Sequence, residues 1–285
     1  MVTTTSLVSV LLAVIQLLFG MTNVTLQGTA EFRLNDERFK GVEARYVQDS
    51  GDSFWQLKLY TPRMDGTERE TGYTIICNEN ADWEANIYVM SAYEPGVYRS
   101  MIEDHAQPTL VTPTVKMMQL ADLALALTPV FEAALPEGAV TVTEGENGGS
   151  ALRLVLREED ITPLMNAAFN NIALPVTEHV FRTERGLSYD TLWGPPAGMD
   201  AYTTVTDGLL WSARSLNLRG ADITVTMDAE GLITAAKGSL IIDVETETDG
   251  TLGLAIDFDG TMSDYGTSHV DAFDAEAFGV VPASD

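Results

Sequence analysis

The chain has 285 residues, 45% of them hydrophobic and 20% charged, so it has enough apolar material for one large domain or two ordinary ones. It contains 16 Lys and Arg against 42 Asp and Glu, which gives a formal net charge of −26. This charge repels phosphate backbones, so we expect no nucleic-acid partner. The acids are spread along the chain as a solvated surface, which suits a basic protein partner; adaptation to high salt would give the same composition.

Cysteine and histidine usage excludes several kinds of site. Cys77 is the single cysteine, so neither an intramolecular disulfide nor a thiolate metal cluster is possible. The three histidines, His105, His179 and His269, are far apart in the sequence, which argues against a histidine-rich zinc site. We therefore expect no metal and no other cofactor.

The segment from Leu7 to Phe19 is apolar except for Ser9 and Gln16. It is short for a membrane span, which needs about 20 residues. It has the length of a signal-peptide core, but the first basic residue of the chain is Arg33. Small and polar residues recur along it at helical spacing, which is typical of a helix buried by its own protein. We expect residues 1–20 to form such a helix, with a cleaved signal or a membrane anchor as alternatives.

From residue 21 onward the pattern changes to strict alternation. Val24 to Leu34 places apolar side chains on one face and polar ones on the other, which predicts a strand with one solvated face. Further alternating runs open at Val42 and Trp55, and two more cover Tyr73–Cys77 and Ile87–Ala92. Short strands in series with polar turns predict an antiparallel meander.

The middle of the chain is helical in period. Two helices are predicted, 114–135 and 160–174, with Pro129 kinking or dividing the first. Asp160 is expected to cap the second helix and Pro175 to stop it. A strand pair, 139–143 and 151–156, lies between them, and residues 176–208 have no readable pattern.

From Leu209 the meander resumes, with strands over 223–227, 233–244 and 252–262. The predicted fold class is α+β: one large curved antiparallel β-sheet, a half-barrel-like meander, with helices covering the concave face. We expect a single β-rich domain over residues 21–285, with a central helical segment over 114–174.

Two motifs suggest catalysis without the context that it needs. Asp257-Phe258-Asp259-Gly260-Thr261 resembles the first motif of haloacid-dehalogenase-like phosphatases, but that motif should end the first strand of a parallel α/β fold. The alternative is the solvent face of an alternating strand. Glu178-His179 resembles part of the inverzincin zinc motif, but position 175, where that motif needs its first histidine, is Pro175.

Two weaker signals concern ions and glycans. Asp257, Asp259 and Asp264 offer oxygen ligands to Ca²⁺, but they lack the spacing of an EF-hand loop. Asn23-Val24-Thr25 satisfies the N-glycosylation pattern, which often arises by chance.

The order of elements resembles the LolA-like envelope lipoproteins, including the LppX/LprG type. The resemblance is carried by the helix Leu7–Phe19 running into Asn23–Gly28, and by the ending Met262-Ser263-Asp264-Tyr265-Gly266. The chain departs from that family because it has no lipobox cysteine. A weaker similarity is to envelope proteins of gut-type Firmicutes.

This resemblance implies an extracytoplasmic carrier, in the cell envelope or secreted, that holds a lipid or other apolar ligand between sheet and helices. Because no catalytic motif in the sequence has the context that it needs, we expect the protein not to be an enzyme. A non-enzymatic envelope interaction or structural module with a solid core is the alternative, and the phosphatase is a remote one. The predicted cavity lining has nine residues: Trp55, Leu57, Leu59, Met117, Met118, Phe169, Ile242, Leu254 and Phe258. Each of these would equally suit a closely packed core.

Overall fold

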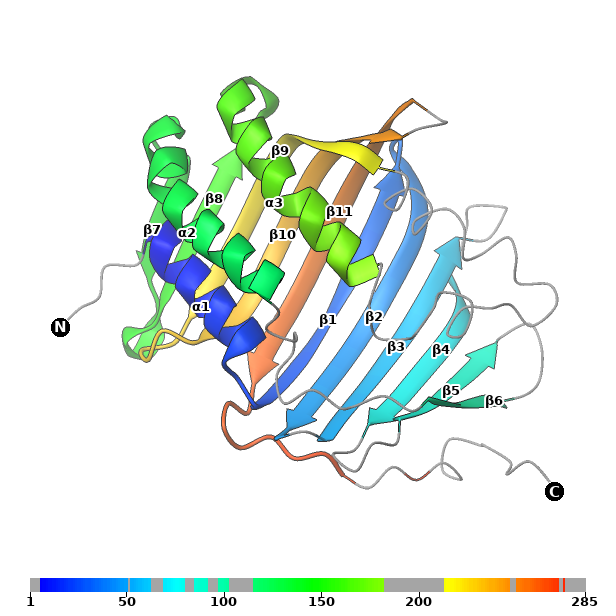
Figure 1. Cartoon of the computed structure of the whole chain (residues 1–285). Coiled ribbons are helices and arrows are strands. Elements are labelled where there is room, and N and C mark those ends of the chain that lie inside the picture. The colour runs from blue at the N-terminus through cyan, green and yellow to red at the C-terminus, as the bar shows by residue number, and fades with distance from the viewer. Residues whose placement is uncertain are drawn as a thin grey trace. The chain divides into compact units, whose positions relative to one another are not determined.

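The computed structural model describes residues 6–50, 52–62, 69–79, 85–91, 97–102, 115–181, 213–246, 250–271 and 274. The strands are hydrogen-bonded in the order β6-β5-β4-β3-β2-β1-β11-β10-β9-β8-β7 (Figure 1). The chain divides into two compact units: unit 1 is Met1–Ile15, Arg33–Glu37 and Pro113–Asp257, and unit 2 is Gln16–Phe32, Arg38–Thr112 and Phe258–Asp285. The predicted fold class, α+β with a large antiparallel sheet, is confirmed.

Unit 2 is built from the N-terminal meander. Its strands are β1 (Asn23–Leu34, up to Phe32), β2 (Glu37–Asp49, from Arg38), β3 (Asp52–Pro62), β4 (Arg69–Glu79), β5 (Ala85–Ser91) and β6 (Val97–Ile102). The β2–β3, β3–β4, β4–β5 and β5–β6 pairs are antiparallel, and Trp55 of β3 pairs with Tyr46 of β2 and Cys77 of β4. β6 was not predicted from the sequence.

Unit 1 contains most of the helical residues and the C-terminal meander. Its elements are α1 (Leu7–Phe19, of which Leu7–Ile15 belong to this unit), α2 (Val115–Ala134), β7 (Val140–Glu144), β8 (Ser150–Leu156), α3 (Pro163–Phe181), β9 (Ala213–Met227), β10 (Ile233–Thr246) and β11 (Thr251–Ser263, up to Asp257). β7 pairs with β8, β8 with β9 and β9 with β10, all antiparallel. α3 packs against β9 and contacts α2.

α1 has the bounds of the apolar segment, Leu7–Phe19, and packs against the protein along one face. Ser6 caps it, because the Ser6 hydroxyl accepts a hydrogen bond from the Ser9 N–H at 3.2 Å. Val10, Ala13 and Leu17 fall on one face and are only 8–9% exposed. Among the described residues no helix is long and apolar enough to cross a membrane.

The two central helices differ from their predicted bounds in detail. α2 runs through Pro129 as one helix instead of dividing there. α3 is capped by Thr162, whose hydroxyl accepts from the Met165 N–H at 3.2 Å. Asp160 instead closes a short 3₁₀ turn by accepting from the Arg157 N–H at 3.0 Å. α3 also continues past Pro175 to Phe181, although sequence propensity treats a proline as a stop.

The core of unit 1 is made by alternate residues of its strands together with α3. β9 buries Leu216 and Leu218, and their register partners on β10, Val244 and Ile242, are buried as well. Met165, one turn into α3, is 1% exposed. Side chains of a strand alternate between the two faces of a sheet. The buried apolar side chains of β9 and β10 therefore face the helices, and the polar side chains between them face the opposite side.

Candidate ligand-binding surface

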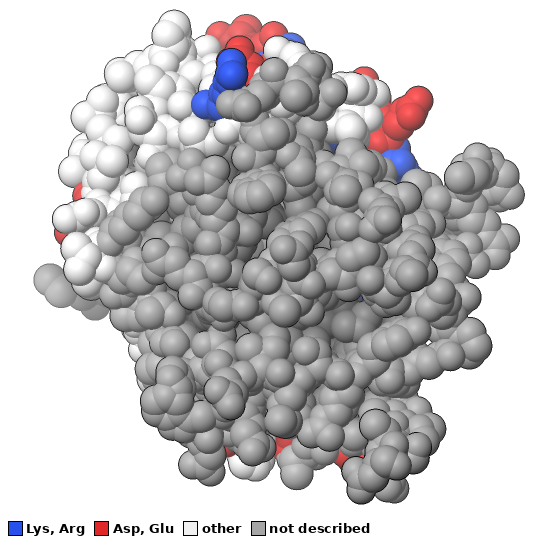
Figure 2. Space-filling view, turned by 45° about the vertical axis from the view of Figure 1, so that its right-hand side comes forward, with Lys and Arg blue, Asp and Glu red and all other residues white. Residues whose placement is uncertain are grey.

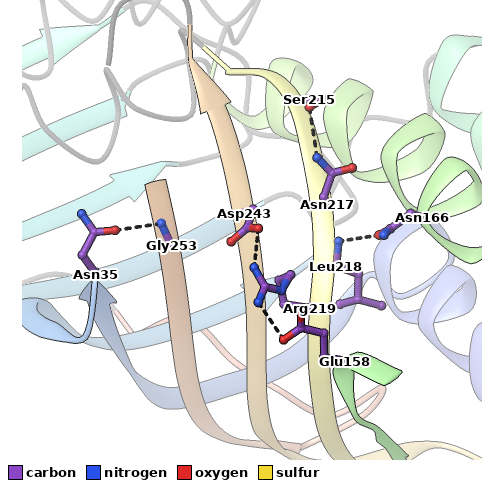
Figure 3. Close-up of polar contacts among 9 residues, drawn as sticks. All are labelled: Asn35, Glu158, Asn166, Ser215, Asn217, Leu218, Arg219, Asp243 and Gly253. Atoms are coloured by element: carbon purple, nitrogen blue, oxygen red, sulfur yellow. Dashed lines mark hydrogen bonds and ion pairs between the residues drawn. The ribbon is translucent and has the colours of Figure 1, made fainter. Parts of the chain in front are cut away.

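Three side-chain hydrogen bonds fix the helices of unit 1. The Leu7 N–H, at the start of α1, donates to Glu132 Oε1 near the end of α2 at 3.2 Å. On α3, Asn166 Oδ1 accepts from the Leu218 N–H at 2.7 Å (Figure 3), and Asn170 Oδ1 accepts from the Leu216 N–H at 2.8 Å. Residues four apart lie on the same helix face, so the two asparagines contact the strand together.

The two asparagines complete a strand edge that β8 leaves open. The pairing of β8 with β9 ends at Leu156 and Ala221, whereas β9 begins eight positions earlier, at Ala213. Over this stretch β10 occupies one edge of β9. A buried backbone N–H without a partner costs about 1–3 kcal/mol, so the side-chain amides of α3 take the place of a neighbouring strand.

The helices of unit 1 are unusually poor in charge for this protein. α1 has no charged residue, α2 has Lys116, Asp122 and Glu132, and α3 has Glu178. The visible surface at the upper left of Figure 2, the side on which the helices lie in Figure 1, is correspondingly almost free of acidic and basic side chains. The charge of −26 is therefore carried mainly by other segments.

Large apolar side chains are exposed on these helices. Eight large hydrophobic residues in the described part of the chain are at least 41% exposed, and six of them lie on helices. The six, which we call the apolar helix set, are Leu12, Val115, Met118, Leu123, Val130 and Leu164. At about 100° per residue, the four members on α2 fall on one side of that helix. Contiguous exposed apolar patches mark sites for a hydrophobic ligand or partner, so we take the apolar helix set as the candidate ligand-binding surface.

The predicted cavity residues are distributed over both units. In unit 1, Ile242 and Leu254 are buried at 4% and 0% exposure, Phe169 is partly buried and Met118 is 45% exposed. In unit 2, Phe258 is partly buried. The side chains of the remaining four, Trp55, Leu57, Leu59 and Met117, lie outside the described residues. Their joint role in holding a ligand stays a prediction.

A cleft of about 470 Å³ lies where the pairing of β9 with β10 shifts. The strand register passes from the pair Ile242–Leu218 to the pair Ile241–Gly220. Arg219 therefore has no paired residue on β10 and forms a β-bulge. Its guanidinium donates to Glu158 through Nη2 and to Asp243 through Nη1, each at 2.7 Å (Figure 3). The cleft is lined by Val155, Leu156, Arg157, Glu158, Arg219, Gly220, Ala221, Asp222, Ser239, Ile241 and Asp243.

The electrostatics of this cleft do not favour acid–base chemistry. Hydrogen bonds to Glu158 and Asp243 raise the pKa of Arg219, so this side chain stays charged. The Arg153 guanidinium, at 2.6 and 2.8 Å from the two oxygens of Asp222, lowers the pKa of that carboxyl. A general acid or base needs a pKa near the working pH, and both shifts run away from it.

The segment that resembles a phosphatase motif lies within a strand. β11 continues to Ser263, so Asp257 is in mid-strand instead of at a strand end. Asp257 accepts an ion-paired hydrogen bond from Arg33 at 2.7 Å, and Asp259 is exposed. Asp257 and Asp259 therefore lie on the solvent face of an alternating strand, which is the alternative to a phosphatase motif given above.

The two candidate metal motifs are the Asp257, Asp259 and Asp264 group and the Glu178-His179 pair, and the structure describes the side chains of the first group alone. Within the described part of the chain, no three His, Cys, Asp or Glu side chains come together as a metal site. Glu178 and His179 belong to α3, which has Pro175 at the missing ligand position, but their side chains lie outside the described residues.

Sequence reasoning missed the role of Asn166 and Asn170. Apolar residue type alone does not identify the buried face of α3 either, because Leu164 is 57% exposed whereas Met165 is 1% exposed. The only signal in the sequence was the presence of two asparagines four residues apart within a predicted helix. Asparagine is unfavourable in the interior of a helix, so such a pair suggests a specific role.

No protein-family model and no curated protein matches the chain. Among solved structures, it is similar to a LolA superfamily protein from Nitrosomonas europaea, with 8% identity, a TM-score of 0.25, and coverage of 95% of this chain and 96% of that chain. It is also similar to a DUF1329 family protein from Desulfovibrio piger, with 9% identity, a TM-score of 0.27 and coverage of 94% of each chain. The comparisons give no support to the similarity with Firmicutes envelope proteins. At these TM-scores the two likenesses carry no argument about function.

Proposed function

We propose that the protein is a non-enzymatic, extracytoplasmic binding or carrier protein for a lipid or other apolar ligand. The ligand binds at the apolar helix set of unit 1. The single observation that supports this proposal is the exposure of six large apolar side chains on helices that carry four charged residues.

Physical chemistry favours a ligand at this surface. Each buried Å² of apolar surface contributes about 25 cal/mol, so covering several Val, Leu and Met side chains gives several kcal/mol. The low charge of the helices removes the desolvation penalty that charged side chains would impose on an apolar ligand. An uncharged or weakly charged ligand also avoids repulsion by the acids of the rest of the chain.

Binding of N-phenyl-1-naphthylamine, an uncharged fluorescent probe, tests this proposal, with palmitate and a neutral phospholipid as competitors. Val130→Lys places a charge within the apolar helix set. We expect it to weaken probe binding about tenfold or more, since burying an unpaired ammonium group costs more than the 1.4 kcal/mol that a tenfold change represents.

Val142→Lys is the matched control. Val142 lies on β7 and is 46% exposed, against 48% for Val130 on α2, so residue type, exposure and added charge are the same. The control should bind the probe within about twofold of the unchanged protein. Equal loss in both variants, or no probe binding by the unchanged protein, would contradict the proposal.

A second candidate is an envelope interaction module with a solid core. It is favoured by the complete burial of Leu216, Val244 and Leu254, which are at most 1% exposed and already form a packed interior in unit 1. Under this alternative the apolar helix set contacts a protein instead of a small ligand. The same probe experiment separates the two, because a flat protein-binding surface gives no displacement by palmitate or phospholipid.

A further inference from the structure

The residues that follow β11 fold back onto the beginning of β1 and the end of β2. We call Asp264–Asp271 the C-terminal clasp. A turn with positive φ at Asp264 (56°) and Gly266 (70°) reverses the chain, and the Ser268 N–H donates to the Asp264 carbonyl at 2.8 Å. The Gly266 N–H then donates to the carbonyl of Asn23, the first residue of β1, at 3.1 Å. All of these residues belong to unit 2.

Polar groups removed from water hold the clasp in place. Ser268 is 6% exposed, and its hydroxyl donates to the carbonyl of Gln48, which is fully buried. The Asn23 amide donates both to the Ser268 carbonyl at 3.2 Å and to Asp49 Oδ1 at 2.9 Å. The amide nitrogen of the glycosylation triplet therefore serves the fold, since it bridges β2 and the clasp.

Asp49 is the group on which the contacts converge. Besides the Asn23 amide, its carboxylate accepts from the Val270 N–H and lies 2.8 Å from His269 Nδ1 through Oδ2. Three hydrogen bonds from β1 and the clasp thus depend on one ionised carboxyl at the end of β2. A carboxylate accepts such bonds more strongly than a protonated carboxyl does.

The charges around His269 all have the same sign. Asp49 at the end of β2, Asp52 at the start of β3 and Asp271 within the clasp act on the imidazole. The hydrogen bond to Asp49 raises the pKa of His269, and the two further aspartates add to this. Conversely, the hydrogen bond from His269 lowers the pKa of Asp49.

We propose that the C-terminal clasp is a pH-dependent latch, closed when His269 is protonated and Asp49 is ionised, and loosened outside that range. The contribution of His269 is complete below about pH 6.5, the value of a free histidine, and is lost as the pH rises through its raised folded-state value. The contribution of Asp49 is complete above about pH 4 and is lost as the pH falls through its lowered folded-state value. The proposed latch is separate from the proposed ligand binding and does not depend on it.

Hydrogen–deuterium exchange of the full-length protein, read at the Gly266 and Ser268 amides, tests the latch. Protection is compared at pH 5.5 and pH 8.0 after correction for the intrinsic exchange rate. We expect lower protection at pH 8.0, because His269 is then deprotonated. Each unit by which the pKa of His269 exceeds that of a free histidine should lower the protection factor by at most about tenfold. An NMR titration of the His269 ring gives that shift directly.

Two variants distinguish a charge-dependent latch from a merely structural contact. His269→Gln keeps a hydrogen-bond donor without a titrating group and should abolish the difference between the two pH values. Ser268→Ala removes the bond to Gln48 and should lower protection at both pH values while keeping the difference. The proposal is overturned if the unchanged protein is equally protected at both pH values, or if His269→Gln keeps the full difference.

Discussion

At Gly28, the backbones of β1 and β11 pass too close together for a side chain. A Cβ built there would lie 2.6 Å from the Asp259 carbonyl oxygen and 2.8 Å from the Gly260 Cα. Both neighbours are backbone atoms, so no rotamer change relieves the contact. Gly28→Ala should therefore lower the free energy of unfolding by about 1–3 kcal/mol, measured by urea denaturation.

Gly253 provides the matched control for this substitution. It also lies in a strand, but its nearest neighbour would be Asn35 Oδ1 at 3.6 Å, an ordinary van der Waals distance. Gly253→Ala should change the stability by less than about 0.5 kcal/mol. If the two alanine variants lose the same stability, the close approach at Gly28 does not exist in solution.

Several basic residues on the described strands lie beside acids of a neighbouring segment. Arg33 pairs with Asp257, Lys58 with Glu43 and Arg153 with Asp222, at 2.7, 3.0 and 2.6 Å. The hydrogen bond from Lys58 lowers the pKa of Glu43, and a second one from Tyr60 adds to this. Because all these groups are partly solvated, the pairs align strands more than they stabilise the protein.

At the scale of elements, α3 depends on two asparagines for its position on β9. Asn166→Ala and Asn170→Ala each leave one β9 N–H without its acceptor, which costs about 1–3 kcal/mol. Asn171→Ala is the control, because Asn171 is exposed and its amide bonds only to Ala167 of its own helix. The three variants gain the same helix propensity, so differences in urea midpoint isolate the strand contact. A loss in Asn171→Ala as large as in the other two would contradict this role.

Alternation and helical period were enough to predict most elements of the chain. α1 coincides with the apolar segment Leu7–Phe19, and β1, β10 and β11 were predicted within a few residues, since each has a long and regular pattern. The first half of β9 was missed because Arg214, Asn217 and Arg219 interrupt the apolar run. The Arg219 guanidinium bonds to Glu158 and Asp243, which are 61 and 24 positions away in sequence, and no local pattern contains such partners.

The candidate site was harder to predict than the fold. Whether an apolar helix residue is covered or exposed depends on how the helices pack: Val130 is 48% exposed, whereas Met165 is 1% exposed. The strand edge that Asn166 covers exists only because β8 ends opposite Ala221. Both features follow from register and packing, which arise only when distant segments meet.

At the scale of the whole molecule, the formal charge of −26 opposes compaction through self-repulsion. Salt screens such repulsion within about 10 Å at 0.1 M and 3 Å at 1 M. Raising NaCl from 0.05 to 1 M should therefore increase Tm, with each 1 kcal/mol of relief giving about 2–4 °C. A Tm that falls with salt would show that the surface ion pairs outweigh the repulsion.

The central claim, that the protein carries an apolar ligand, is tested most directly by native mass spectrometry. The full-length protein is purified without detergent and measured before and after extraction with organic solvent. The account predicts an additional mass of a few hundred daltons that extraction removes, and that is reduced in Val130→Lys but retained in Val142→Lys. A single mass equal to that of the bare chain, unchanged by extraction and by incubation with phospholipid or fatty acid, would contradict it.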